Sequence, residues 1–211
     1  MGNNKVTIFF SRRKILQYVF KQQWISLVEE FKPEEICKRL DFKNNMELAY
    51  DLFFKNLDDD DIQDFAVRLF FQIKLTYPTE WNADWKNDAF LGNLCSNTWR
   101  YDEMYECYKD AYDKLEDPPD SLLLLLAGCN NAPGTPPITI QESEAYLKRA
   151  VAKKITYEAA LMMKGLAREQ KNQENEKYWD FMCKDLKEKN IRTEMIIPDV
   201  LLTHKRYPFK D

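Results

Sequence analysis

The chain has few of the residues on which tight turns and catalytic triads depend. Its 211 residues include only five glycines and one histidine. Sandwiches and barrels use glycine in their many tight turns, so this scarcity argues against them and favours helices. A serine or cysteine triad needs a base, and the one histidine, His204, lies in a tail bounded by prolines. We therefore expect His204 to be a surface residue and the protein not to be an enzyme.

Motifs for nucleotides, metals and membrane spans are missing as well. The sequence has no G-x-G-x-x-G, P-loop or G-x-S-x-G motif. Its five cysteines are widely spread and form no C-x-x-C pair, which is typical of reduced, buried thiols in a cytosolic protein. The longest strongly apolar run, residues 122–127, is far too short to cross a bilayer. We expect a cytoplasmic protein with no cofactor, no metal and no membrane partner.

The charge balance is slightly acidic, with 31 Lys and Arg against 35 Asp and Glu and a formal net charge of −4. A protein that depends on phosphate contacts has a clustered basic excess. The only dense basic cluster is 12–14, which we interpret as a solvated end of a helix, so nucleic acid is not an expected partner. The acidic run 58–61 has three interpretations. It stabilises the start of a helix through capping and the helix dipole, or it is an acidic surface that meets a basic protein. A Mg²⁺ or Ca²⁺ site is the third, but adjacent aspartates at a helix start fan around the axis and cannot converge on one ion without distant partners.

Apolar residues recur at helical spacing nearly throughout the chain and predict about ten helices, hence an all-α fold. We expect Ser11 to cap the first helix, Pro33 to open the second, and Tyr77-Pro78 to end the helix that starts at the acidic run. The only strand candidate is 6–10, and the tail from Ile191 is expected to be irregular. The later helices are expected at 80–97, 100–116, 121–129, 139–153, 156–171 and 174–189.

Three of the five glycines, Gly92, Gly128 and Gly165, are spaced by 36 and 37 residues and fall inside predicted helices. Glycine costs about 1 kcal/mol relative to alanine in a helix interior, so we expect each to allow close approach of a paired helix. A break and a second helix follow each glycine. Helix–turn–helix units with a period of roughly 34–40 residues are typical of an α-solenoid.

Within this repeat, Leu91-Gly92 is followed by Tyr101, Tyr108 and Ala111, and a glycine-proline loop precedes the Glu144-Ala145 pair of the next unit. With these features, residues 85–189 resemble tetratricopeptide repeats, particularly the SEL-like variant. The third unit keeps its glycine but lacks the second-helix alanine, and residues 1–80 match the pattern poorly. The resemblance implies a right-handed solenoid of antiparallel helix pairs over 81–189, with 1–80 as diverged repeats or a helical cap and 190–211 as a C-terminal tail.

Proteins of this family generally bind other proteins in a concave groove and perform no chemistry, so the resemblance implies a protein-interaction module. Four tyrosines, at 101, 105, 108 and 112, follow one helical stripe. Such a stripe is more often core than binding surface. Tyrosine and tryptophan are nevertheless typical of interface hot spots. The candidate partner-binding residues are Trp99, Tyr101, Tyr105, Tyr112, Asp58, Asp59, Asp60 and Asp61.

Several functions fit these features. One is a stoichiometric inhibitor, such as a toxin immunity protein, whose negative charge would speed capture of a basic toxin or effector. Another is an adaptor or scaffold in a regulatory complex. A third is an enzyme that uses carboxylates without histidine, for which the sequence offers no defined pair among its 35 acidic residues.

Overall fold

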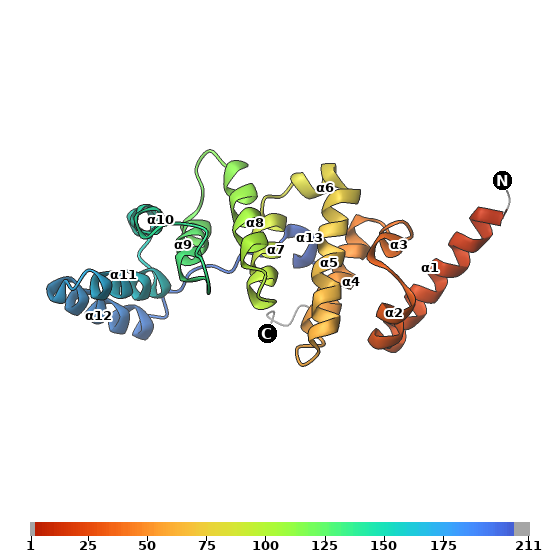
Figure 1. Cartoon of the computed structure of the whole chain (residues 1–211), viewed down its shortest axis with the longest axis horizontal. Helices are drawn as coiled ribbons and strands as arrows, with labels where there is room; N and C mark the ends of the chain where they lie inside the picture. The colour runs from red at the N-terminus through yellow and green to blue at the C-terminus, as the bar shows by residue number, and fades with distance from the viewer. Residues whose placement is uncertain (1–2, 205–211) are drawn as a thin grey trace. The chain divides into compact units, whose positions relative to one another are not determined.

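The computed structural model describes residues 3–204, with side chains from Arg12 onward, and this part of the chain consists of helices and loops (Figure 1). The expected all-helical fold is confirmed. The described residues form thirteen α-helices and one 3-10 helix, where about ten helices were predicted. The strand candidate at 6–10 is wrong, because this backbone is part of helix α1 (Asn3–Lys21). No described helix is long and apolar enough to cross a membrane.

The chain divides into two compact units. Unit 1 consists of residues 1–87, 97–99 and 197–211, and unit 2 of residues 88–96 and 100–196. The chain therefore returns to unit 1 after the last helix of unit 2.

Unit 1 is built around α5, which packs against four other helices of the unit: α2, α3, α4 and α6. Its core consists of large side chains with almost no exposure, among them Tyr50, Phe53, Phe70 and Trp81. The helices of unit 1 are α1 (Asn3–Lys21), α2 (Trp24–Glu30), α3 (Pro33–Cys37), α4 (Phe42–Phe54), α5 (Asp60–Thr76), α6 (Pro78–Asn82) and α13 (Asp199–Leu202).

Local side-chain chemistry sets several helix boundaries of unit 1. Pro33 lies in the first turn of α3, where its missing N–H is tolerated. The side chain of Asp59 caps α5 by accepting a hydrogen bond of 3.0 Å from the amide of Ile62. Ser11 does not cap a helix, because it lies inside α1. The first predicted helix is in fact two helices, separated at Gln22 and Gln23.

In unit 2 each helix from α8 to α11 packs against the next helix in the chain. Ala150 of α10 and Ala159 of α11 are both fully buried, in a cluster with Leu123 and Leu147. The elements of this unit are most of α7 (Lys86–Asn97), α8 (Tyr101–Asp113), α9 (Asp120–Gly128), the 3-10 helix η1 (Cys129–Asn131), α10 (Ile140–Lys153), α11 (Tyr157–Glu169) and α12 (Gln173–Glu188).

The expected packing role of glycine is confirmed at Gly92 alone among the three spaced glycines. A β-carbon at Gly92 would overlap the ring of Tyr108. At Gly128 and Gly165 no atom lies within 4 Å of the position that a β-carbon would take, so the prediction is wrong at both. The regular glycine spacing does not correspond to one repeated helix contact.

Four helices are followed by a residue in the left-handed backbone conformation that is not glycine. After each of them, the next amide donates a 2.9 Å hydrogen bond to the carbonyl five residues earlier, as in a Schellman motif. Glycine usually occupies this position because it has no β-carbon to clash. The scarcity of glycine therefore leaves backbone strain at these helix ends. The residues are Gln22 (φ 54°), Trp99 (φ 61°), Lys171 (φ 55°) and Asn190 (φ 52°).

Candidate functional site

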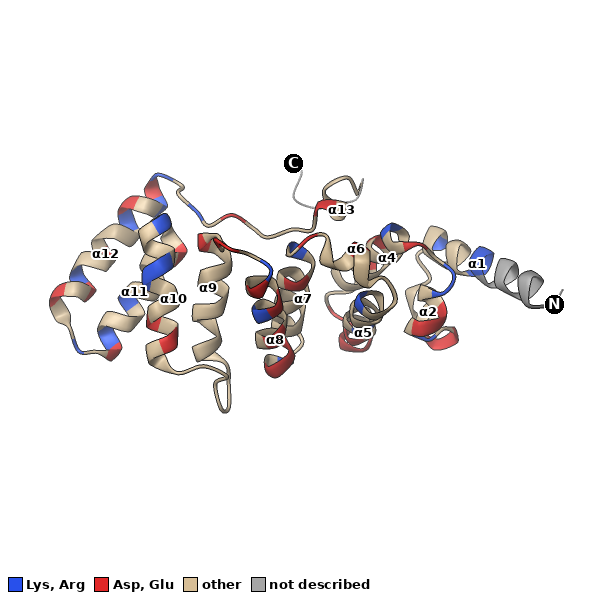
Figure 2. Cartoon of the chain, turned by 90° about the horizontal axis from the view of Figure 1, so that it is seen from above, with Lys and Arg blue, Asp and Glu red and all other residues tan. Residues whose placement is uncertain are grey.

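Helix α8 contains the predicted tyrosine stripe and has one buried and one acidic face. The buried side chains are Met104, Cys107, Tyr108 and Ala111, which recur at helical spacing. The exposed side of the helix is mostly acidic, as Figure 2 shows by the red segments of α8. The exposed acidic residues are Asp102, Glu103, Glu106, Asp110 and Asp113.

Tyr108 is a core residue, as a tyrosine stripe of this kind predicts. Its ring fills the space beside Gly92, and its hydroxyl donates a hydrogen bond of 2.7 Å to Oδ1 of Asn93. Burial raises the pKa of Tyr108 far above that of a solvated tyrosine, because the phenolate would lose its hydration. Tyr108 therefore fastens α8 to α7.

The three tyrosines proposed for partner binding, Tyr101, Tyr105 and Tyr112, are half-buried. The hydroxyl of Tyr112 accepts a hydrogen bond of 2.6 Å from Nη1 of Arg149, and its ring makes an edge contact with Tyr146 at a centroid distance of 5.8 Å. Tyr112 thus joins α8 to α10 and has a structural role. Partial burial raises the pKa of Tyr105. Tyr101 and Tyr105 have ring surface available to a partner, because both remain partly exposed.

The acidic face of α8 is only partly neutralised. Nζ of Lys109 lies 2.9 Å from Oδ2 of Asp113, and Nη1 of Arg100 lies 2.9 Å from Oε1 of Glu103. Asp102 forms no ion pair with any other described residue. Ion pairs between exposed side chains interact only weakly. The acidic face therefore keeps a negative potential that extends into solvent.

Trp99 of unit 1 is exposed and strained. Its side chain is 77% exposed, and its φ of 61° places it in the left-handed region. Positive φ is unusual for a bulky residue, and strained backbone of this kind is enriched at functional sites. Of the predicted site residues, Trp99 has the geometry most typical of a binding anchor.

The acidic run of unit 1 has a structural explanation. Asp59 caps α5, and Asp60 and Asp61 lie in the first turn of that helix, where negative charge interacts favourably with the helix dipole. Asp58, Asp60 and Asp61 are exposed. Within residues 12–204, no group of three or more His, Cys, Asp or Glu side chains is placed to hold a metal ion.

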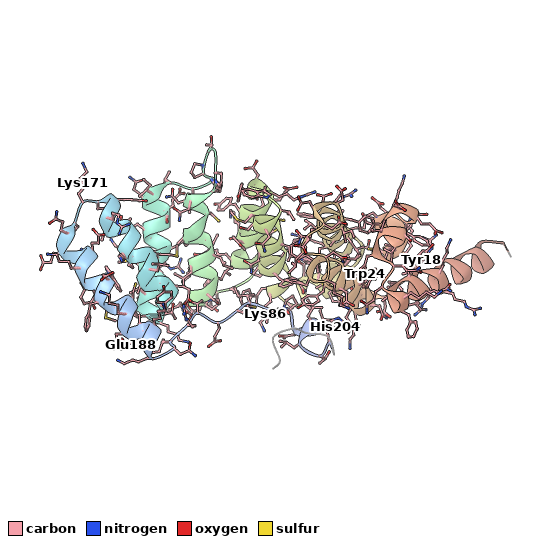
Figure 3. The ribbon with its side chains drawn as sticks, turned by 90° about the horizontal axis from the view of Figure 1, so that it is seen from below. Tyr18, Trp24, Lys86, Lys171, Glu188 and His204 are labelled. Carbon is pink, nitrogen blue, oxygen red and sulfur yellow. The ribbon has the colours of Figure 1, made fainter. Side chains whose placement is uncertain are left out.

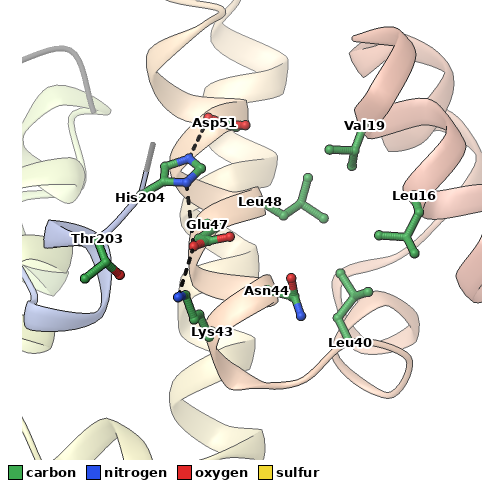
Figure 4. A pocket seen from close by; sticks show the side chains of 10 residues that line it. All are labelled: Leu16, Val19, Leu40, Lys43, Asn44, Glu47, Leu48, Asp51, Thr203 and His204. Carbon is green, nitrogen blue, oxygen red and sulfur yellow. Dashed lines mark hydrogen bonds and ion pairs between the residues drawn. The ribbon is translucent and has the colours of Figure 1, made fainter. Parts of the chain in front are cut away.

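The expectation that His204 is a surface residue is wrong. Its side chain is only 10% exposed and points toward α4 (Figures 3 and 4). Nε2 of the ring lies 3.1 Å from Oδ1 of Asp51, and Nδ1 lies 3.6 Å from Oε1 of Glu47. The ring also makes an edge contact with Tyr50 at 5.8 Å. Local sequence gives one hint of this partner, since Asp51 is a charged residue inside the apolar run 48–54.

The tail that leads to His204 is fastened to unit 1 at a second point. The amide of Asp199 donates a hydrogen bond of 2.8 Å to Oδ2 of Asp84, and the Asp199 carboxylate lies 2.6 Å from Nζ of Lys86. Helix α13, which starts at Asp199, packs on α4. The tail is irregular over 191–198, as predicted, and then forms this short helix.

A cavity of about 380 Å³ lies beside His204 in unit 1, between α1, α4 and the tail (Figure 4). Two carboxylates, Glu47 and Asp51, line it. Asp51 is already paired with Lys55 at 2.8 Å as well as with His204, and Glu47 lies 3.9 Å from Lys43. Both carboxylates therefore have partners within the fold, and their contacts with His204 hold the tail on α4.

The prediction of buried thiols is confirmed. All five cysteines are buried, and none forms a disulfide bond. Burial raises the pKa of Cys37 and of Cys129 to about 12, which disfavours the nucleophilic thiolate.

Comparison of the chain with protein-family models, with curated proteins and with solved structures found no match. The tetratricopeptide resemblance therefore stays a prediction from the sequence pattern.

Proposed function

We propose that this protein is a non-enzymatic interaction module that binds a basic partner protein. The observation that carries the proposal is Trp99, whose ring is 77% exposed on a left-handed backbone. Glycine would adopt this backbone without strain, so tryptophan at this position costs backbone free energy that glycine would not. A partner that buries the ring would gain the large contact area that makes tryptophan a frequent hot spot.

The charge of the protein supports a basic partner. The chain has a net charge of −4, and the exposed side of α8 has five acidic residues. Negative potential speeds the encounter with a positively charged protein and needs no fixed geometry relative to the anchor. The sequential packing of α8 to α12 is compatible with the repeat architecture that the sequence predicts.

Two forms of this function are open. In the first, the protein is a stoichiometric inhibitor that masks a basic toxin or effector, as an immunity protein does. In the second, it is an adaptor that holds its partner in a regulatory complex. They differ in whether binding abolishes the partner's own activity, so an activity assay of the captured partner separates them.

The test is affinity capture from native lysate with the tagged full chain, followed by titration of the purified partner at about 0.1 M and 0.5 M salt. We expect one stoichiometric partner, bound more weakly at the higher salt. Trp99→Gly should weaken binding at least tenfold, as expected for loss of a hot-spot side chain. Lys171→Gly is the matched control, because it relieves the same left-handed strain at an unrelated helix end.

Two results would overturn the proposal. One is that no stoichiometric partner is captured at either salt concentration. The other is that Trp99→Gly and Lys171→Gly bind the purified partner as tightly as the unmodified chain. Circular dichroism of both variants establishes that any loss of binding is not a loss of fold.

A further inference from the structure

The N-terminal part of the chain has a charge opposite to that of the whole. Residues 1–28 include five Lys and Arg and no Asp or Glu, whereas the complete chain has a net charge of −4. Most of these residues belong to α1, the helix at the red end of the chain in Figure 1. All five basic residues of this N-terminal part therefore lie on one helix, with no acidic residue among them.

One face of α1 packs on the rest of unit 1. Ile15 is fully buried, and the ring of Tyr18 makes an edge contact with Phe31 at 6.5 Å. The hydroxyl of Tyr18 donates a hydrogen bond of 2.6 Å to Oε2 of Glu30, and Lys14 pairs with the same carboxylate. These apolar and polar contacts hold the inward face of α1 on the rest of unit 1.

The other face of α1 combines apolar and basic side chains in solvent. Phe20 is 84% exposed, so this large apolar side chain lacks cover. Arg12 and Arg13 are exposed nearer the start of the helix, and neither forms an ion pair with a described residue. We call Arg12, Arg13 and Phe20 the outer face of α1.

We propose that the outer face of α1 binds the surface of an anionic lipid bilayer. Interfacial helices place aromatic and aliphatic side chains at the boundary between headgroups and acyl chains, while Arg and Lys contact anionic headgroups. The outer face offers both kinds of side chain on a helix that is already folded. Binding therefore requires little ordering of this segment.

A second copy of the chain and nucleic acid both fit the outer face of α1 less well. A two-fold contact between copies through this face would place the same cations of α1 near each other. Duplex nucleic acid would pair with Arg12 and Arg13, but its stacked bases give Phe20 no apolar environment. A bilayer surface accommodates the charge and the apolar side chain together.

This inference revises the expectation of no membrane partner. That expectation followed from the lack of a spanning segment, whereas a peripheral helix does not need to span the bilayer. It is independent of the proposed protein partner, because Trp99 and α8 take no part in it. The proposal of a protein partner and the proposal of bilayer binding can therefore be tested and rejected separately.

The test is flotation of the full chain with vesicles of phosphatidylcholine alone or with about 30% phosphatidylserine, at low and high salt. We expect binding only to the anionic vesicles, and weaker binding at high salt. Arg12→Gln with Arg13→Gln should lower partitioning about thirtyfold, since each basic residue near an anionic surface contributes about fivefold. Phe20→Ser should lower it about tenfold through lost apolar burial.

Matched control variants show whether binding depends on where the side chains lie or only on the loss of charge and apolar surface. Lys171→Gln with Lys177→Gln removes the same charge from exposed residues of unit 2, and Leu75→Ser removes a side chain that is 74% exposed on α5. Both control variants should bind anionic vesicles as the unmodified chain does. Equal loss in the control and α1 variants would overturn the assignment to this face.

Four further results would overturn the proposal. The first is no binding to anionic vesicles at low salt, and the second is equal binding to both kinds of vesicle. The third is binding of a single-stranded oligonucleotide that depends on Arg12 and Arg13, while vesicles are not bound. Light scattering of Phe20→Ser and of the unmodified chain tests the remaining occupant, since a dimer lost in the variant would assign the face to a second copy.

Discussion

Gly92 of α7 lies against the ring of Tyr108 of α8 with no room for a β-carbon between them. Tyr108 cannot easily move away, because it is buried and its hydroxyl bonds to Asn93. We therefore expect Gly92→Ala to lower the free energy of unfolding by about 1–3 kcal/mol, as overpacking does. Urea unfolding measures this change.

A second substitution tests the cause. Tyr108→Ala removes the ring atoms that a β-carbon at position 92 would overlap, so Gly92→Ala should cost less in that background than in the unmodified chain. Equal cost in both backgrounds would show that the contact between Gly92 and Tyr108 is not the reason.

Gly165 should respond in the opposite direction. It lies inside α11, and no atom is within 4 Å of the position of an added β-carbon. Alanine is favoured over glycine in a helix by about 1 kcal/mol, so Gly165→Ala should raise the free energy of unfolding by about that amount. A destabilised Gly165→Ala variant in urea unfolding would restore the repeated packing contact that the sequence spacing suggested.

These two glycines show what periodic spacing can and cannot predict. Gly92 and Gly165 have the same place in the sequence repeat, but only one faces a bulky ring. The boundaries predicted at Pro33, at the acidic run and at Tyr77-Pro78 were accurate because proline geometry and side-chain capping act within a few residues. What a glycine faces depends on a helix elsewhere in the fold.

The site shows the same division. The tyrosine stripe predicted a buried member, and Tyr108 is that member. The sequence could not show that Tyr112 accepts a hydrogen bond from Arg149, which lies 37 residues away. Nor could it place His204 beside Asp51, 153 residues earlier in the chain. Such contacts arise from tertiary packing, and no pattern within one segment records them.

Strain at the left-handed helix ends predicts stabilising substitutions. Lys171 has φ 55° after α11, a conformation that costs an ordinary residue about 1 kcal/mol or more. Lys171→Gly should therefore raise the free energy of unfolding by about 0.5–1 kcal/mol, partly offset by the greater freedom of glycine in the unfolded chain. The measurement is the urea midpoint.

The neighbouring residue is the control for this effect. Gln170 has φ −75°, where glycine gives no steric relief, so Gln170→Gly should be neutral or destabilising. If Lys171→Gly is destabilised as much as Gln170→Gly, strain at this helix end is not significant.

The ion pairs of Asp180 in α12 should make the stability of the fold depend on pH in acid. Lys164 at 2.5 Å and Lys184 at 2.8 Å hydrogen-bond its carboxylate and lower the pKa of Asp180 to about 2 from 3.8. A lowered carboxyl pKa stabilises the fold fully above the unfolded value, and that contribution is lost as the pH falls toward 2. Asp180→Asn should therefore melt below the unmodified chain at pH 6, and the difference should shrink between pH 4 and pH 2. A difference that is constant with pH would contradict this coupling.

The contact between His204 and α4 predicts that one substitution loosens the tail. His204→Ala removes the hydrogen bond to Asp51 and the edge contact with Tyr50, and leaves Asp51 with Lys55 as its charged partner. A hydrogen bond to a charged group contributes about 1.5–3 kcal/mol, so α13 should open more often. Hydrogen exchange at the amides of 199–203 should become faster, while exchange within α11 and α12 should not change. Thr203→Ala is the control, because Thr203 is exposed beside the histidine. Unchanged exchange in the His204→Ala variant would mean that the contacts of Asp199 with Asp84 and Lys86 hold the tail by themselves.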